Sequence, residues 1–198
     1  MEKTSFVRDG DFTDKLWEKG TRILSCTLFF VSGFVLSGAG LFSMKTPLCV
    51  SLAAACTGYE LFFAAAGGLC GAFLRLSGGD LINTAVPLAG IAGVIFAIEK
   101  MNIRKKKRTV LCISVFALCA ACGTAVMFSQ APSLADFILV LCSALICAGC
   151  VVFYSGTVDC IRKKRNIYML DNHSLICIMM SICTLFLGSS EVSIFGFR

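Results

Sequence analysis

Long apolar runs separated by short polar segments dominate the chain. The runs cover residues 23–42, 48–59, 61–74, 81–98, 110–128, 134–158 and 175–187. A bilayer core is about 30 Å thick, and a helix needs about 20 apolar residues to cross it. Because lipid offers no partners to backbone N–H and C=O groups, crossing segments of this kind must be helical. The pattern predicts an all-α fold, a polytopic transmembrane helical bundle with about six to seven hydrophobic helices.

The region 47–76 contains two apolar runs that are each shorter than a membrane crossing. Pro47 favours a helix start, the run 48–59 follows, and Glu60 separates it from the run 61–74. Two short helices of this kind form either two short crossings or one re-entrant hairpin. Half-helices at membrane depth are tolerated only where protein buries their ends. We therefore expect a short-helix hairpin here.

Composition and charge divide the chain into two parts. Residues 1–22 are polar and mixed in sign, which predicts a cytoplasmic N-terminal tail, and residues 23–198 form the transmembrane helical domain. The chain is 57% hydrophobic with a mean hydropathy of +0.84, against about 45–50% apolar residues in soluble domains. The spans use nearly all of the length, so we expect no separate soluble domain.

Two basic clusters lie directly beside apolar runs and hold nine of the 18 Lys and Arg residues of a chain whose net charge is +6. They are Arg104, Lys105, Lys106, Lys107 and Arg108, and then Arg162, Lys163, Lys164 and Arg165. Basic residues next to a transmembrane helix mark loops that face the cytoplasm and anionic lipid. No aromatic residues that could stack on bases are interleaved with them, which argues against a nucleic-acid partner. The prediction is a multi-pass cell-membrane protein with the N-terminus and both basic loops cytoplasmic, and residues 47–76 must then cross an even number of times.

Few residues could carry chemistry. Glu60 is the best candidate for a polar site within the membrane, where it could bind a proton or a cation, but it could also lie in a surface loop. His173 is expected in a polar loop or helix cap, Asp136 in the first turn of a helix, and Asp159 as a charge partner of the adjacent basic cluster. These isolated residues predict no catalytic, cofactor or metal site, and hence no enzyme.

The chain contains 13 cysteines, twelve of them in apolar runs. Two C-x-x-C pairs, Cys119 with Cys122 and Cys147 with Cys150, each lie on one face of a predicted helix. The spacing could indicate metal or redox chemistry, but no His or acid lies nearby, and buried Cys behaves as a small apolar residue. We interpret the pairs as small-residue packing. Small residues also recur at a spacing that suits close helix packing, which is common in membrane bundles. They are Gly33 with Ser37, Gly67 with Gly71, and Gly90 with Gly93.

The order of spans and turns resembles the membrane region of stage II sporulation protein E in its clostridial form. The resemblance rests on the Pro47-led helix, the small-residue segment 65–74, the Gly78-Gly79 turn, the span that Ser133 opens, and the basic loop with the helix that ends at Gly188. In that family about ten spans precede a cytoplasmic metal-dependent serine/threonine phosphatase, which activates the forespore sigma factor. The resemblance implies a membrane-anchoring domain that localises and self-associates, with division-septum proteins as partners and without the phosphatase.

A transport component is the alternative. About 200 residues and six spans match the substrate-binding subunits of energy-coupling-factor transporters. Such a subunit should bring polar and aromatic side chains together inside the bundle. The single Trp17 and the three tyrosines show no such convergence in sequence.

Overall fold

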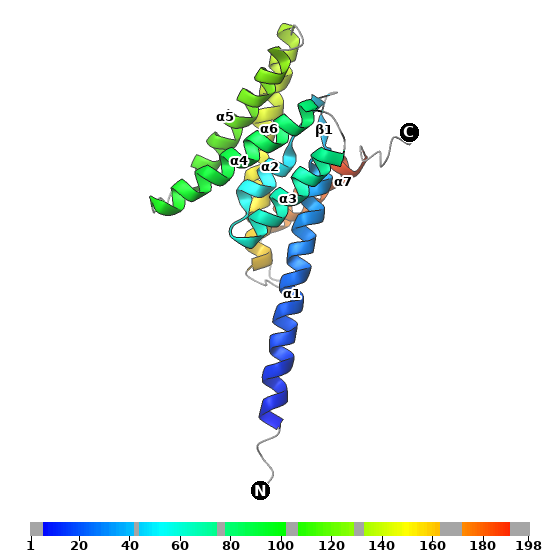
Figure 1. Ribbon diagram of the computed structural model, residues 1–198, viewed down its shortest axis with the longest axis vertical. Helices are drawn as coiled ribbons and strands as arrows, with labels where there is room; N and C mark the ends of the chain where they lie inside the picture. The colour runs from blue at the N-terminus through cyan, green and yellow to red at the C-terminus, as the bar shows by residue number, and fades with distance from the viewer. Residues whose placement is uncertain are drawn as a thin grey trace.

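The computed structural model describes residues 6–41, 44–74, 78–101, 107–128, 133–162 and 172–190. These ranges contain seven helices: α1 Phe6–Leu36, α2 Leu48–Ala55, α3 Tyr59–Leu74, α4 Gly78–Lys100, α5 Lys107–Phe128, α6 Leu134–Arg162 and α7 Asn172–Ser190. Their only other regular element is an antiparallel pair of two-residue strands, β1 Gly40–Leu41 and β2 Met44–Lys45. The all-α fold and the helix number are confirmed. Figure 1 shows α5 and α6 projecting at one end and the start of α1 at the other.

Three helices are long and apolar enough to cross a membrane: Leu81–Lys100 in α4, Lys107–Phe128 in α5 and Leu134–Ile161 in α6. Shorter apolar helices span Arg22–Leu36, Tyr59–Leu74 and Asn172–Phe186. The outward-facing side chains of these helices are largely apolar, and they include Ile23, Phe62, Phe96, Ile113, Leu145 and Phe186. In water such a surface would be highly unfavourable. The chain is therefore a membrane protein with several apolar helices.

The first helix differs from the predicted run at both ends. It begins at Phe6 and continues through the polar tail without a break at residue 22, so the boundary at 22–23 is a change in hydropathy within one helix. It ends at Leu36 rather than at residue 42. Ser37, Gly38 and Gly40 follow, and these are weak helix formers. The chain then turns through the β1–β2 pair, where Thr46 N–H donates to the carbonyl of Ala39 at 2.8 Å.

The predicted short-helix hairpin is confirmed. Helix α2 has 8 residues, a length of only about 12 Å, and α3 has 16. The break lies earlier than Glu60, because Cys56 is extended and Gly58 has a φ of 61°, a left-handed conformation that favours glycine. Seven of the eight α2 side chains, from Leu48 to Ala54, are buried. Helix α2 thus lies inside the bundle, against α6, α3, α4 and α1.

Small residues bring α1 and α3 into the most extensive helix contact among the described elements. A methyl group placed on Gly33 would overlap the carbonyl oxygen of Ala64, and one on Gly67 would overlap that of Phe30. A methyl group on Gly71 would likewise overlap the side-chain oxygen of Ser37. The spacings of Gly33 with Ser37 and of Gly67 with Gly71 therefore do mediate helix packing. They do so within one chain.

The contacts also fix the directions of the short helices. Arg22 and Tyr59 line the same groove at the start of this contact, and Ser37 meets Gly71 at its end, so α3 runs parallel to α1. Helix α2 runs parallel to α6, because Ser143 donates to Thr46 at 3.3 Å and Ser51 donates to the carbonyl of Cys147 at 2.7 Å. Helix α2 therefore finishes, and α3 begins, at the end of the bundle where α6 finishes.

Candidate functional site: a polar cavity at the basic end of the bundle

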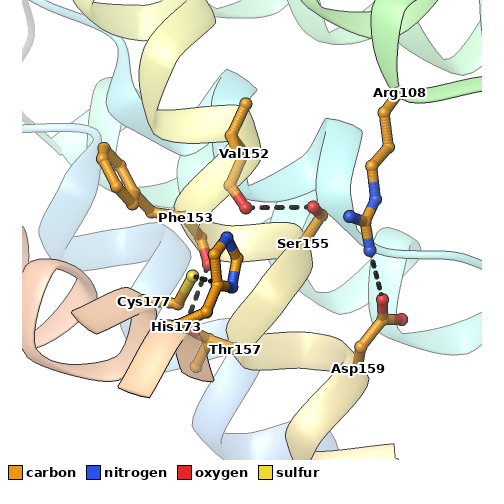
Figure 2. Close-up of polar contacts among 8 residues, drawn as sticks. All are labelled: Arg108, Val152, Phe153, Ser155, Thr157, Asp159, His173 and Cys177. Carbon is orange, nitrogen blue, oxygen red and sulfur yellow. Dashed lines mark hydrogen bonds and ion pairs between the residues drawn. The ribbon is translucent and has the colours of Figure 1, made fainter. Parts of the chain in front are cut away.

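An ion pair joins the first turn of α5 to the last part of α6. The guanidinium of Arg108 donates to Asp159 at 2.6 Å (Figure 2). The two side chains are 60% and 44% exposed, so screening makes the pair a modest contributor to stability. Asp159 is expected to pair with the basic cluster that follows it in sequence, whose side chains lie outside the described residues; among the described residues its partner is Arg108, from the other cluster. The contact places the beginning of α5 and the end of α6 at the same end of the bundle.

A polar cavity of about 370 Å³ lies beside this ion pair. Its walls come from three places in the fold: the end of α2, the first turns of α5, and the face of α6 that carries Val151, Ser155 and Asp159. The polar lining consists of Thr57, Lys107, Arg108, Thr109, Ser155 and Asp159. Small-molecule sites typically have volumes of about 300–1,000 Å³. This cavity is at the small end of that range, and it is the best candidate site that the described residues offer.

The predicted basic residues contribute to this end only in part. Lys107 and Arg108 line the cavity, and Arg162 is the last residue of α6. The remaining members of the clusters lie outside the described residues: Arg104, Lys105, Lys106, Lys163, Lys164 and Arg165. Sequence position alone connects these six residues to the ends of α5 and α6.

Glu60 lies away from the cavity. It is half-buried and occupies the first turn of α3, so it belongs to a helix and not to an irregular interruption between two helices. A carboxylate is favourable at a helix N-terminus, because the unpaired N–H groups there carry partial positive charge. Its neighbour Tyr59 lines a separate, largely apolar groove of about 430 Å³ together with Arg22 and Phe63.

His173 and Asp136 also occupy first turns of helices. His173 lies at the start of α7, with its Nδ1 3.6 Å from Sγ of Cys177, on the side of α6 opposite Arg108 (Figure 2). Asp136 accepts from the hydroxyl and from the N–H of Ser133, at 2.8 and 2.9 Å, while its own N–H donates to the Ser133 hydroxyl at 3.3 Å. This is a reciprocal helix cap. It confirms Asp136 as a first-turn residue and makes Ser133 the cap of α6.

Hydroxyl groups join α6 to α7 in a polar seam that sequence reasoning missed. Tyr154 Oη donates to Thr184 at 2.8 Å, and the hydroxyls of Thr157 and Ser181 are 2.9 Å apart. The partners are spaced three apart on both helices, so each pair lies on one face. This matched spacing of hydroxyl residues on two apolar helices is the sequence feature from which the contact between α6 and α7 could have been predicted. Such bonds between membrane helices contribute about 0.6 kcal/mol each on average.

All thirteen cysteines lie in the described part of the chain, and none forms a disulfide; seven are buried, three are partly buried, and Cys70, Cys142 and Cys183 are exposed. Cys119, Cys122, Cys147 and Cys150 are all buried where α5 packs against α6. No three His, Cys, Asp or Glu side chains in the described ranges come close enough to hold a metal ion. The interpretation of the C-x-x-C pairs as small apolar packing residues stays a prediction.

Comparison with known proteins adds no assignment to this geometry: the chain matches no family model, no curated protein and no solved structure.

Proposed function

We propose that the chain is a multi-pass membrane anchor that self-associates and positions a partner or an attached domain at the cytoplasmic face. In this proposal the N-terminal tail and both basic loops are cytoplasmic. The role is that of the membrane region of stage II sporulation protein E, and division-septum proteins are the proposed partners. The proposal concerns anchoring and placement, without catalysis.

The observation that carries the proposal is the gathering of basic segments at one end. Arg108 contacts Asp159, Thr57 lines the same cavity as Lys107, and Tyr59 lies beside Arg22. The ends of α2 and α6 and the beginnings of α3 and α5 therefore share one end with the boundary of the tail. This agrees with the positive-inside rule, which places Lys and Arg of short loops on the cytoplasmic side.

Two exposed rows of small side chains support self-association. They are Ala89, Gly93 and Ala97 on α4, and Ala117, Ala121 and Ala125 on α5. A methyl group added to Gly93 would meet nothing within 4 Å, in contrast to the glycines between α1 and α3. Residues spaced four apart form one helix face, and small side chains there let a second helix approach closely.

Reporter fusions test the orientation. An enzyme active only in the cytoplasm, fused after Arg108 or Arg165, should be active, and the same enzyme after Gln130 should be silent. An enzyme active only outside should give the opposite pattern. External activity after Arg108 would contradict the proposal, because α2 and α3 would then fail to return the chain to the side from which it entered.

Localisation tests the anchoring role. A fluorescent protein fused after Arg198 should collect at the polar septum of a sporulating cell, and Gly93→Leu should disperse the signal over the membrane. Gly149→Leu is the matched control, because Gly149 is also exposed with open space beside it. A uniform signal from the unchanged chain would contradict placement, and equal dispersal by both variants would contradict association through α4.

A transport component is the second candidate, and helix α2 is the observation that favours it. Transporters place short, interrupted helices inside the bundle to form substrate sites, and α2 is short, buried and finishes at a polar cavity. Uptake of a labelled small molecule into vesicles that depends on Ser155 would favour this reading over the anchor. Uptake that is unchanged by Ser155→Ala would not favour a transport role for this cavity.

A further inference from the structure

The polar cavity has the charge of an anion site. Lys107 and Arg108 contribute two positive charges and Asp159 one negative charge, which leaves one net positive charge on the lining. Lys107 forms no ion pair with another described residue. The Arg108–Asp159 bond uses one of the five N–H donors of the guanidinium. The hydroxyl of Thr109 adds a neutral donor from α5, whereas the Ser155 hydroxyl on α6 donates to the carbonyl of Val152 at 3.0 Å (Figure 2).

The cavity also lies at the level of a membrane surface. Lys107 is the first residue of a membrane-length helix, and Asp159 is three residues from the last residue of another. Lipid phosphates lie where such helices leave the hydrocarbon core. In sequence, the cavity residues adjoin both basic clusters, which attract anionic lipid to this end of the bundle.

From these features we propose that the cavity binds the phosphate group of an anionic phospholipid. The ammonium of Lys107 and the free N–H groups of Arg108 bind the phosphate oxygens, and the hydroxyl of Thr109 completes the contact. Asp159 orients the guanidinium and also competes with the phosphate for it. This site goes beyond the anchoring role, since it requires only that the cavity lie at a membrane surface, on either side.

Lipid titration of the purified full chain in neutral detergent tests the site, with bound lipid counted by native mass spectrometry. Phosphatidylglycerol is the probe, phosphatidylcholine with the same acyl chains is the neutral comparison, and inorganic phosphate is the soluble comparison. Lys107→Gln should weaken phosphatidylglycerol binding about tenfold, as expected for the loss of one charge-assisted contact. Lys100→Gln is the matched control, because Lys100 is an exposed lysine at the end of α4 outside the cavity lining, and it should change binding less than twofold.

Asp159→Asn separates a binding role from a structural one. Removing the competing carboxylate charge frees the guanidinium, so phosphatidylglycerol should bind several-fold more tightly, while phosphatidylcholine binding stays constant. Thermal unfolding in detergent alone shows whether each variant is folded. Weaker binding by a folded Asp159→Asn variant would overturn the proposal, and so would equal losses for Lys107→Gln and Lys100→Gln. Competition by millimolar inorganic phosphate as effective as that by the lipid would make the cavity a site for soluble anions and overturn the lipid assignment.

Discussion

Gly67→Ala should separate helices α1 and α3 and destabilise the fold by about 3 kcal/mol, the upper part of the usual range for overpacking. The added methyl group would overlap the Phe30 carbonyl oxygen. That atom belongs to the backbone of α1, so no side-chain rotation can relieve the overlap. The whole helix must move away, and the contacts at Gly33 and Gly71 weaken with it. Unfolding of the purified protein by a denaturing detergent measures the effect.

Gly149→Ala is the control for this prediction. Its methyl group would meet nothing within 4 Å, and alanine is a better helix former than glycine by about 1 kcal/mol. The control should therefore be neutral or slightly stabilising. Equal stability of the Gly67 and Gly149 variants would show that α1 and α3 are not in close contact.

Ala53→Leu should be the second most disruptive single change, with a loss of about 2–3 kcal/mol. Ala53 is fully buried in the middle of α2. Helices α1, α3, α4 and α6 surround α2, so three additional carbon atoms have no lipid into which they can extend. We expect α2 to be displaced, and the bond from Ser51 to the carbonyl of Cys147 to break. Thermal unfolding in detergent measures the loss of stability. Loss of protection of Cys49 from a thiol reagent measures the displacement of α2.

Ala92→Leu supplies the same chemical change on an exposed face of α4, outside the two rows of small side chains proposed for self-association. Alanine and leucine differ little in helix propensity, and the larger side chain would extend into lipid. This variant should keep the stability and the thiol protection of the unchanged chain. Comparable losses in both variants would mean that α2 is not enclosed by the bundle.

The sequence predicted those features that depend on one segment at a time. The apolar runs predicted the helices, Asp136 indicated the first turn of a helix, and the position of Glu60 indicated an interruption nearby. The end of α1 was misjudged because apolar residues continue to Phe42, whereas the weak helix formers after Leu36 end the helix. Hydropathy reports contact with lipid or protein interior, and residues 37–39 are buried in protein.

The candidate site depends on distant parts of the chain and was beyond such reasoning. Arg108 and Asp159 are 51 residues apart, and either one had several oppositely charged residues available. The cavity requires the end of α2 to meet α5 and α6, which no local pattern specifies. By contrast, the matched spacing of Tyr154 with Thr157 and of Ser181 with Thr184 was readable, because hydroxyls in apolar helices need partners.

The enclosure of α2 has a consequence for biosynthesis. Ser51 bonds to a carbonyl 96 residues later, so the wall against which α2 packs is synthesised long after α2 itself. Until α6 enters the membrane, α2 has no such wall, and a helix about 12 Å long cannot remain across the bilayer alone. The packing of α2 on all sides is thus completed only late in synthesis, when α6 joins the earlier helices α1, α3 and α4 around it.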